Sequence, residues 1–395
     1  METLIELYDD RPLENVLGVE TFHPRRVVYV CPDSAFQDRR LGEKLKTYFK
    51  HREMDVHVIL ERTSVYDAES VLQVLRKIVT QYPDCAIDIT GGTDAVLFAA
   101  GRLSAEVTVP IFTYSRRKNC FFDIRHASFA DRVGCDVCYS VEDLFVMAGG
   151  SMRPGRVDRS ALQGGLAFVE PFLKIYLQNR RQWPKIVTYI QRISASQAEN
   201  QSLIAQGAFV VKGERGARVS APTEVLRELE QIGMIRELSI QEGESVQFTF
   251  SKEAYRGFLR DVGSVLELYV YKTCLDLEAF QDVCLSAVVD WEGTAGRNAV
   301  SNELDVVCTK GVEPVFISCK TCDVKTEALN ELAILRDRFG GQMARAVIVT
   351  AERGTAAMRN RASELNIEVI DLNDLTQDRI AQRLRRILQK QNRKD

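Results

Sequence analysis

Long apolar runs are missing from this sequence of 395 residues. No stretch approaches the roughly 18 consecutive apolar residues that mark a membrane-spanning helix, so we expect no membrane span. A secretory signal is missing too, because Met1-Glu2-Thr3-Leu4 begins with an acidic residue and runs directly into a strand-like pattern. On this basis we expect a cytoplasmic protein.

An excess of basic charge is also missing. The 52 lysines and arginines are outnumbered by 55 aspartates and glutamates, so the formal net charge is −3. Any contact with nucleic acid must therefore come from local basic patches, because the field of the whole molecule does not attract phosphates.

Cysteine motifs typical of zinc sites are missing as well, although the chain has ten cysteines. Two pairs have the CxxC spacing, Cys135/Cys138 and Cys319/Cys322, but neither encloses the kind of turn that zinc knuckles use. The others lie mostly inside apolar runs, where cysteine behaves as a small hydrophobic residue. We predict buried thiols at Cys31, Cys85 and Cys308.

Strand and helix patterns alternate regularly from residue 3 to about 125. A chain of this length is expected to form two or three domains, and we assign residues 1–150 to the first. Such alternation predicts an α/β, Rossmann-like domain with a parallel sheet that is covered on both faces. The expected strands are Leu4–Tyr8, Arg26–Cys31, Val56–Leu60, Cys85–Ile89 and Val109–Tyr114, and the expected helices span 36–50, 68–80 and 95–106.

Two strand ends in this domain carry residues suited to a ligand: Asp33-Ser34, and the loop Thr90-Gly91-Gly92-Thr93-Asp94, which opens a helix. Ligands bind such sheets at the carboxyl ends of their strands. Paired glycines and a helix N-terminus favour a phosphate, and the threonines offer hydroxyls. The alternative is a plain turn in which Thr93 or Asp94 caps the helix. A dinucleotide cofactor is not expected, because the loop is not GxGxxG.

A middle region, residues 151–252, follows a predicted linker at Gly149–Arg156. Helical patterns over 166–178, 183–192 and 222–232 precede two strand patterns at 234–238 and 245–250, which suggests a winged-helix-like module. The helix after Pro222 is acidic, so it is a poor candidate for reading the major groove of DNA. We therefore favour a packing or dimerisation role.

The C-terminal region, residues 253–395, contains a predicted antiparallel hairpin formed by 301–308 and 314–321. Alternate side chains of a strand share a face, so Glu303 and Asp305 lie together, and so do Ser318 and Lys320. Acids on one strand beside a lysine on the next are typical of a metal-bound site that cleaves phosphodiesters. The alternative is a structural ion pair between Asp305 and Lys320.

The order of helix, three strands, helix and strand around this hairpin resembles the PD-(D/E)xK nuclease core. The resemblance implies that Asp305 and the backbone carbonyl of Cys319 bind Mg²⁺ or Mn²⁺, and that Lys320 positions or activates the attacking water. The sequence departs from the pattern at Ser318, where the family has a glutamate. Another carboxylate must then complete the site, and the candidates, in order, are Glu267, Glu303 and Asp290.

The two halves together resemble the CRISPR-associated Rossmann fold (CARF) ancillary nucleases of type III systems, in their single-chain form. The resemblance implies a homodimer that binds cyclic tetra-adenylate at the paired N-terminal domains and is thereby activated to cut DNA or RNA, with single strands favoured and little sequence preference. Thr90–Asp94 and Asp33-Ser34 would line the ring, with Asn15, Tyr114 and Ser115 as weaker candidates.

Two other functions stay open at this point. The first is a transcriptional regulator whose N-terminal domain senses a ligand and whose winged helix binds DNA. The second is degradation of the activator by the N-terminal domain itself.

Overall fold

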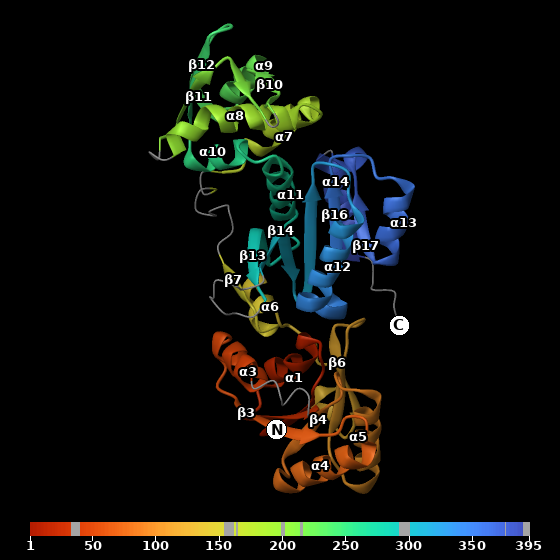
Figure 1. The fold of residues 1–395 in the computed structure, drawn as a ribbon. Coiled ribbons are helices and arrows are strands. Elements are labelled where there is room, and N and C mark those ends of the chain that lie inside the picture. Colours follow the sequence, from red (N-terminus) through yellow and green to blue (C-terminus); the bar gives the residue numbers. More distant parts are fainter. Residues whose placement is uncertain are drawn as a thin grey trace.

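A computed structural model describes the chain at residues 1–32, 40–153, 162, 165–198, 202–213, 216–291, 301–375 and 377–389. The molecule is elongated, with the N-terminal domain at one end, the middle region at the other and the C-terminal sheet between them (Figure 1). No helix in the described ranges is both long enough and apolar enough to cross a membrane.

The N-terminal domain has a six-stranded sheet in the order β3-β2-β1-β4-β5-β6. Its first five strands are parallel, which confirms the predicted Rossmann-like class, and β6 adds an antiparallel edge that we had not predicted. The strands are β1 (Thr3–Leu7), β2 (Arg26–Pro32), β3 (His57–Thr63), β4 (Cys85–Asp88), β5 (Ile111–Ser115) and β6 (Cys120–Arg125).

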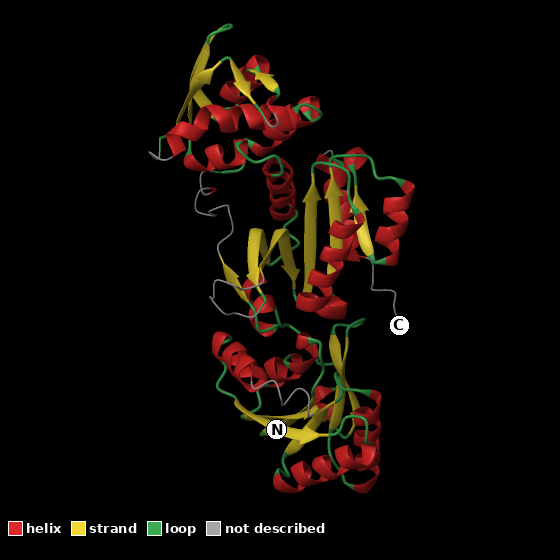
Figure 2. Ribbon diagram, viewed as in Figure 1, coloured by secondary structure: helices red, strands yellow, loops and turns green. Residues whose placement is uncertain are grey.

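Helices cover both faces of this sheet, as Figure 2 shows. One face packs against α1 (Leu17–Phe22) and α3 (Arg40–His51), and the other packs against α4 (Ala68–Gln81) and α5 (Asp94–Glu106). A short 3-10 helix, η1 (Pro12–Asn15), lies between β1 and α1, and η2 (Ser128–Ala130) follows β6. The central strands are buried on both faces, which explains their continuous apolar sequence.

The middle region contains α7 (Val169–Asn179), α8 (Trp183–Ala198) and α9 (Thr223–Gln231). The predicted hairpin is present as β11 (Ile235–Gln241) and β12 (Ser245–Phe250), and β8 (Ile204–Ala208) pairs with β12 as a third strand. A small ribbon is formed by β9 (Val210–Lys212) and β10 (Arg218–Ser220). The apolar face of α9 is buried in a core that continues into the C-terminal domain.

The C-terminal sheet has the order β17-β16-β15-β14-β13-β7. Its strands are β7 (Ser151–Arg153), β13 (Asp282–Asp290), β14 (Ser301–Lys310), β15 (Glu313–Lys320), β16 (Arg345–Thr350) and β17 (Ile367–Ile370). The helices around it are α6 (Val141–Met147), α10 (Glu253–Leu259), α11 (Ser264–Asp276), α12 (Thr326–Gly340), η5 (Gly341–Met343), α13 (Ala356–Glu364), η6 (Leu372–Asp374) and α14 (Gln377–Gln389).

Two local predictions for this region were wrong. The sequence from Arg256 to Leu275 predicts one helix, but the structure has two, because Asp261 accepts hydrogen bonds from the backbone N–H groups of Gly263 and Ser264 at the start of α11. The predicted linker Gly149–Arg156 contains β7, which pairs with the edge of β13, so the C-terminal sheet begins before the middle region. Local sequence does not reveal such pairing across 140 residues.

Candidate active site

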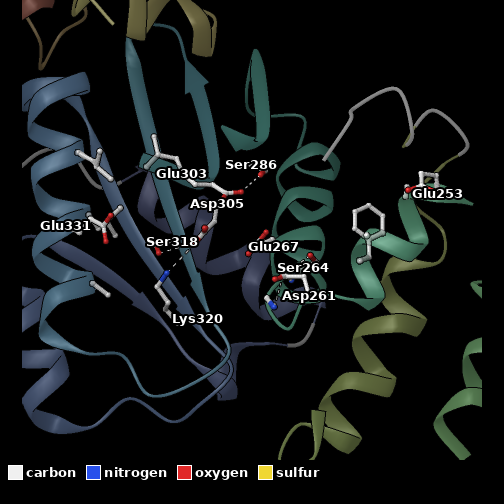
Figure 3. Close-up of a pocket in the computed structure, with 18 residues that line it drawn as sticks. Glu253, Asp261, Ser264, Glu267, Ser286, Glu303, Asp305, Ser318, Lys320 and Glu331 are labelled. Atoms are coloured by element: carbon white, nitrogen blue, oxygen red, sulfur yellow. Dashed lines mark hydrogen bonds and ion pairs between the residues drawn. The ribbon is translucent and has the colours of Figure 1, made fainter. Parts of the chain in front are cut away.

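A pocket opens beside the first half of β14 and the end of β15, between α10 and α11 on one side and α12 on the other (Figure 3). Its polar lining comes from α10, α11, α12, β13, β14 and β15 and from the turn before α11. The lining includes Asp261, Ser264, Glu267, Ser286, Glu303, Asp305, Ser318, Lys320 and Glu331. Most of the residues that we predicted to carry chemistry therefore face one cavity.

Asp305 is the centre of this cavity. Its Oδ2 accepts a hydrogen bond from the backbone N–H of Cys319 at 2.6 Å and another from the Ser318 hydroxyl at 3.1 Å. The Lys320 Nζ lies 3.8 Å from the same oxygen. The structure thus brings Asp305, Ser318 and Lys320 to one side of the hairpin, as the alternation of side chains predicts.

The carboxylate reaches Cys319 because the two strands separate at this point. The pairing of β14 with β15 ends at Val306 and Ile317, next to Asp305. The Lys320 carbonyl accepts from Ala351 on the β16 side, so the backbone of Cys319, one residue earlier, faces β14. The carbonyl of Cys319 therefore faces the Asp305 side of β15, where the nuclease resemblance requires a ligand.

An irregularity in the neighbouring strand β13 affects the same part of the pocket. Leu285 belongs to the core under α11, whereas Ala287, two residues later, belongs to the core under α12. In a regular strand both would share a face. The exchange occurs at Ser286, which has a positive φ of 54° and donates a hydrogen bond from its hydroxyl to Glu303. Such strained backbone is typical of functional sites, and here it orients a carboxylate.

Burial and like charge raise the pKa values of two acids in the pocket, Glu267 and Asp305. Desolvation raises the pKa of Glu267 to about 8, and the nearby charge of Asp305 adds to the effect. Desolvation also raises the pKa of Asp305, although Lys320 and the hydrogen bonds from Cys319 and Ser318 oppose the rise. Carboxyl groups that crowd each other in this way are stabilised as anions when a cation lies between them.

The donor set fits a hard divalent cation. Carboxylates and a backbone carbonyl are oxygen ligands, which Mg²⁺ and Mn²⁺ prefer. In the part of the chain that the structure describes, however, no three His, Cys, Asp or Glu side chains already stand close enough to hold a metal. Asp290 is not brought to the pocket, because it is fully buried and its Oδ2 accepts from Arg153 of β7 at 2.8 Å.

The glycine-rich loop of the N-terminal domain lies at the carboxyl end of β4. A side chain at Gly91 would have its Cβ 2.8 Å from the carbonyl oxygen of Leu7, and Gly92 has a φ of +98°, so neither position tolerates a side chain easily. The Gly92 N–H points at Asp9 Oδ2, 3.3 Å away. The loop is thus tightly folded against the end of β1.

The threonines of this loop already have partners. The Thr90 hydroxyl donates to Asp88 and accepts from the backbone N–H of Tyr114, and the Thr93 hydroxyl donates to the carbonyl of Val65 at 3.3 Å. Thr93 occupies the N-cap position of α5 but makes no side-chain capping bond, and Asp94 is the first residue of that helix. Asp33 and Ser34 fall outside the described residues.

The three weaker candidates have supporting positions. Asn15 is buried and holds the loop after β1 by bonding both the N–H and the carbonyl of Asp9. Tyr114 is buried and donates to Asn119 at 2.7 Å, and Ser115 is half-buried at the end of β5. These contacts show the first two to be scaffold residues of the strand ends.

Charged residues beside the loop were missed by sequence reasoning. Arg11 donates to both carboxylate oxygens of Asp9, at 2.7 and 2.6 Å, and Arg116 forms an ion pair with the buried Glu14. Their signal in the sequence is only that Asp9 and Arg11 follow β1 directly and that Arg116 follows β5 directly. The carboxyl end of a parallel strand is where such residues are expected to matter.

Comparison with known proteins supports this arrangement. Residues 252–392 match the family model described as the Card1-like endonuclease domain. The protein VC1899 from Vibrio cholerae is 17% identical, covering 96% of this chain and 97% of its own, with a TM-score of 0.73. Can2 from Sulfobacillus thermosulfidooxidans, solved in complex with cyclic tetra-adenylate, is 18% identical, covering 99% of this chain and 100% of its own, with a TM-score of 0.71.

A type III CRISPR defence DNA nuclease activated by cyclic oligoadenylate is 15% identical and has a TM-score of 0.51. The match covers 94% of this chain but only 48% of the length of that nuclease. No curated protein matches the sequence. The family model identifies the C-terminal domain and the solved structures show the fold: the chain carries a Card1-like endonuclease domain and shares its overall fold with Can2 and VC1899.

Proposed function

We propose that the chain is a metal-dependent endonuclease of type III CRISPR defence, switched on by cyclic tetra-adenylate bound at the N-terminal domains of a homodimer. The observation that carries the proposal is the placement of Lys320 Nζ 3.8 Å from Asp305 Oδ2 at the mouth of a pocket. A lysine beside a carboxylate in this position matches phosphodiester hydrolysis better than a structural ion pair, because Lys320 is about one-third exposed.

In this mechanism Asp305 and the Cys319 carbonyl would hold Mg²⁺ or Mn²⁺, with Glu267 or Glu303 close by. When bound, the cation would supply Lewis-acid polarisation of the scissile phosphate. The ammonium group of Lys320 orients the attacking water and faces the charge that develops on the phosphoryl oxygens. The Ser318 hydroxyl and the Cys319 N–H, both bonded to Asp305 Oδ2, hold that carboxylate in one orientation.

The activator is proposed to bind at the loop Thr90–Asp94 and at the strand ends beside it. A phosphate there would meet backbone amides at the N-terminus of α5, and the guanidinium groups of Arg11 and Arg116 lie next to the same loop in ion pairs with acids. A ring of four equivalent nucleotides has two-fold symmetry, so two copies of one such surface can share it. Binding of Can2 to cyclic tetra-adenylate supports this assignment.

Direct contacts between the domains support a switch. Val312 and Met343 of the C-terminal domain are buried in the apolar cluster of the N-terminal domain. A Cβ at Gly341 would lie 3.8 Å from the Cβ of Arg11, so the loop after β1 abuts the end of α12. Because α12 also lines the pocket, a shift of this loop can change the geometry of the nuclease site. The activator must bind the shifted arrangement better than the resting one.

The substrate is proposed to be DNA or RNA, with single strands favoured and little sequence preference. The acidic helix α9 buries Val225, Leu226 and Leu229 and carries more acidic than basic side chains, so this helix does not support sequence-specific reading of the major groove. This feature also weighs against a winged-helix regulator.

The proposal is tested by incubating the full-length protein with supercoiled plasmid, single-stranded DNA and RNA, with and without cyclic tetra-adenylate and Mn²⁺. We expect cleavage only when both the activator and the metal are present. Cleavage that persists in EDTA would contradict the metal-dependent mechanism. Cleavage that does not depend on cyclic tetra-adenylate would contradict the proposed activation. A metal-independent, sequence-specific gel shift without cleavage would favour the regulator instead.

A further inference from the structure

The nuclease pattern has a glutamate on the third strand that this pocket lacks on β15. Ser318 occupies the strand position that carries a glutamate in the nuclease pattern, and its hydroxyl is committed to Asp305. Asp290 is buried elsewhere beside Arg153, and Glu303 accepts from Ser286 of β13. Glu267 approaches from α11. None of these acids comes from the face of the sheet toward which Ser318 itself points.

That face is the one covered by α12. On β15, Val315, Ile317 and Cys319 belong to the core under α11, whereas Phe316 belongs to the core under α12. Alternation along the strand therefore directs Ser318 and Lys320 toward α12. A carboxylate that replaces the missing glutamate with the least change of geometry must come from this helix.

Glu331 on α12 meets this requirement. It lines the pocket together with Ala328 and Leu332 of the same helix, and Figure 3 shows Asp305, Ser318 and Lys320 between Glu331 and Glu267 in that view. The Glu331 side chain is exposed, but a hydrogen bond restrains its orientation: its Oε1 accepts from the Asn302 amide at 2.7 Å. Asn302 is itself held by the indole N–H of Trp291 at 2.8 Å.

We propose that Glu331 supplies, from α12, the second carboxylate of the nuclease site in place of the glutamate that Ser318 lacks. This inference rests on the proposed function. The cation would then be held between Asp305 on β14 and Glu331 on α12, with Asn302 orienting Glu331. The end of α12 abuts Arg11 in the N-terminal domain. A movement of Arg11 when the activator binds would therefore move α12 and change the distance between the carboxylates of Glu331 and Asp305.

The test uses the full-length protein and Mn²⁺ as the probe, with binding followed by electron paramagnetic resonance. Glu331→Gln keeps an oxygen that can accept from Asn302 but removes the charge. We expect Mn²⁺ affinity and activated plasmid cleavage to fall at least about tenfold, since even outer-shell changes around metal ligands cost roughly 10–100-fold. Binding of cyclic tetra-adenylate and the midpoint of thermal unfolding should stay unchanged.

Two further variants make the result specific. Glu327→Gln removes an exposed acid one turn earlier on α12, outside the pocket, and should behave as wild type. Adding Ser318→Glu to Glu331→Gln returns a carboxylate to the strand position and should restore Mn²⁺ binding and cleavage.

The outcomes separate this inference from the function on which it rests. A Glu331→Gln protein that binds Mn²⁺ and cuts like wild type would overturn the role of Glu331 and leave the proposed function standing. An impaired variant that Ser318→Glu does not rescue would also overturn it, because Glu331 would then act only through packing or Asn302. Wild-type protein that neither binds Mn²⁺ nor cuts would overturn both.

Discussion

The Lys320 amine and the Asp305 carboxylate lie on the same side of their hairpin, with 3.8 Å between Nζ and Oδ2. Neither side chain is fully buried, since that of Lys320 is 36% exposed and that of Asp305 is 16% exposed. An ion pair with one exposed partner contributes little to stability, which agrees with the proposal that this pair acts on a phosphate.

The first prediction concerns this pair. Asp305→Asn and Lys320→Met should each lower activated cleavage at least about 100-fold, because Asp305 would hold the cation and Lys320 would face the charge that develops on the phosphate. The affinity for cyclic tetra-adenylate, measured by calorimetry, should stay within a factor of about two, since the activator site lies in another domain. Loss of activator binding in either variant would contradict this division of roles.

The second prediction concerns Cys319, whose proposed contribution comes from its backbone. Cys319→Ala should keep cleavage within a few-fold of wild type and lower the free energy of unfolding by about 1 kcal/mol, because it removes a buried sulfur from the core. Cys319→Pro removes the N–H that donates to Asp305 and should abolish cleavage. An alanine variant as inactive as the proline variant would show that the thiol itself takes part.

The third prediction concerns the pH dependence of metal binding. Burial raises the pKa of Glu267 to about 8, so this carboxyl is largely protonated at pH 6 and must release its proton when a cation binds beside it. Mn²⁺ affinity should therefore rise between pH 6 and 8, by up to about tenfold per pH unit for one released proton. Glu267→Gln should flatten the profile; an unchanged slope would exclude Glu267 as the titrating group.

The fourth prediction concerns two acids beneath the proposed activator loop. Glu6 and Asp88 are fully buried on adjacent strands, and both Glu6 oxygens and Asp88 Oδ2 lack hydrogen-bond partners among the described residues. Burial raises the pKa of Asp88 to about 7. Between pH 4 and 7 the unfolded chain has lost a proton that the folded chain keeps, so the free energy of unfolding falls as the pH rises through this window.

Asp88→Asn should remove this cost and stabilise the protein at pH 8 by about 1–3 kcal/mol, with little effect at pH 4. Urea unfolding at the two pH values measures the difference. Asp55→Asn changes an exposed aspartate of the same domain and serves as the control. Equal effects of Asp88→Asn at both pH values would show that Asp88 does not titrate in this window.

The fifth prediction concerns the contact between the domains. Gly341 has a φ of +55°, and a Cβ there would already touch Arg11 at 3.8 Å, so Gly341→Val introduces backbone strain and adds two methyl groups at this contact beside the end of α12. We expect activator binding to persist and the activator-dependent rise in cleavage to fall at least several-fold. Gly243→Val strains a turn at a φ of +75° where a Cβ would meet nothing within 4 Å, and it should leave activation intact.

Much of the fold was predictable because it depends on local patterns. Continuous apolar strands between amphipathic helices indicate a buried parallel sheet, and the hairpin with Asp305 and Lys320 follows from alternation along neighbouring segments. The break between α10 and α11 was missed because the Asp261 cap interrupts an otherwise helical pattern. The strand β7 was missed because its partner β13 lies far along the chain.

Residue order alone was therefore sufficient for the domain types, the hairpin and the acid–lysine pair, since each arises from side chains a few positions apart. The convergence of Glu267, Glu303 and Glu331 on one pocket, the reversal of faces at Ser286 and the contact of Arg11 with Gly341 were decided by packing between distant elements. Those relationships depend on how layers of structure stack in space, and no periodicity within a single segment encodes that.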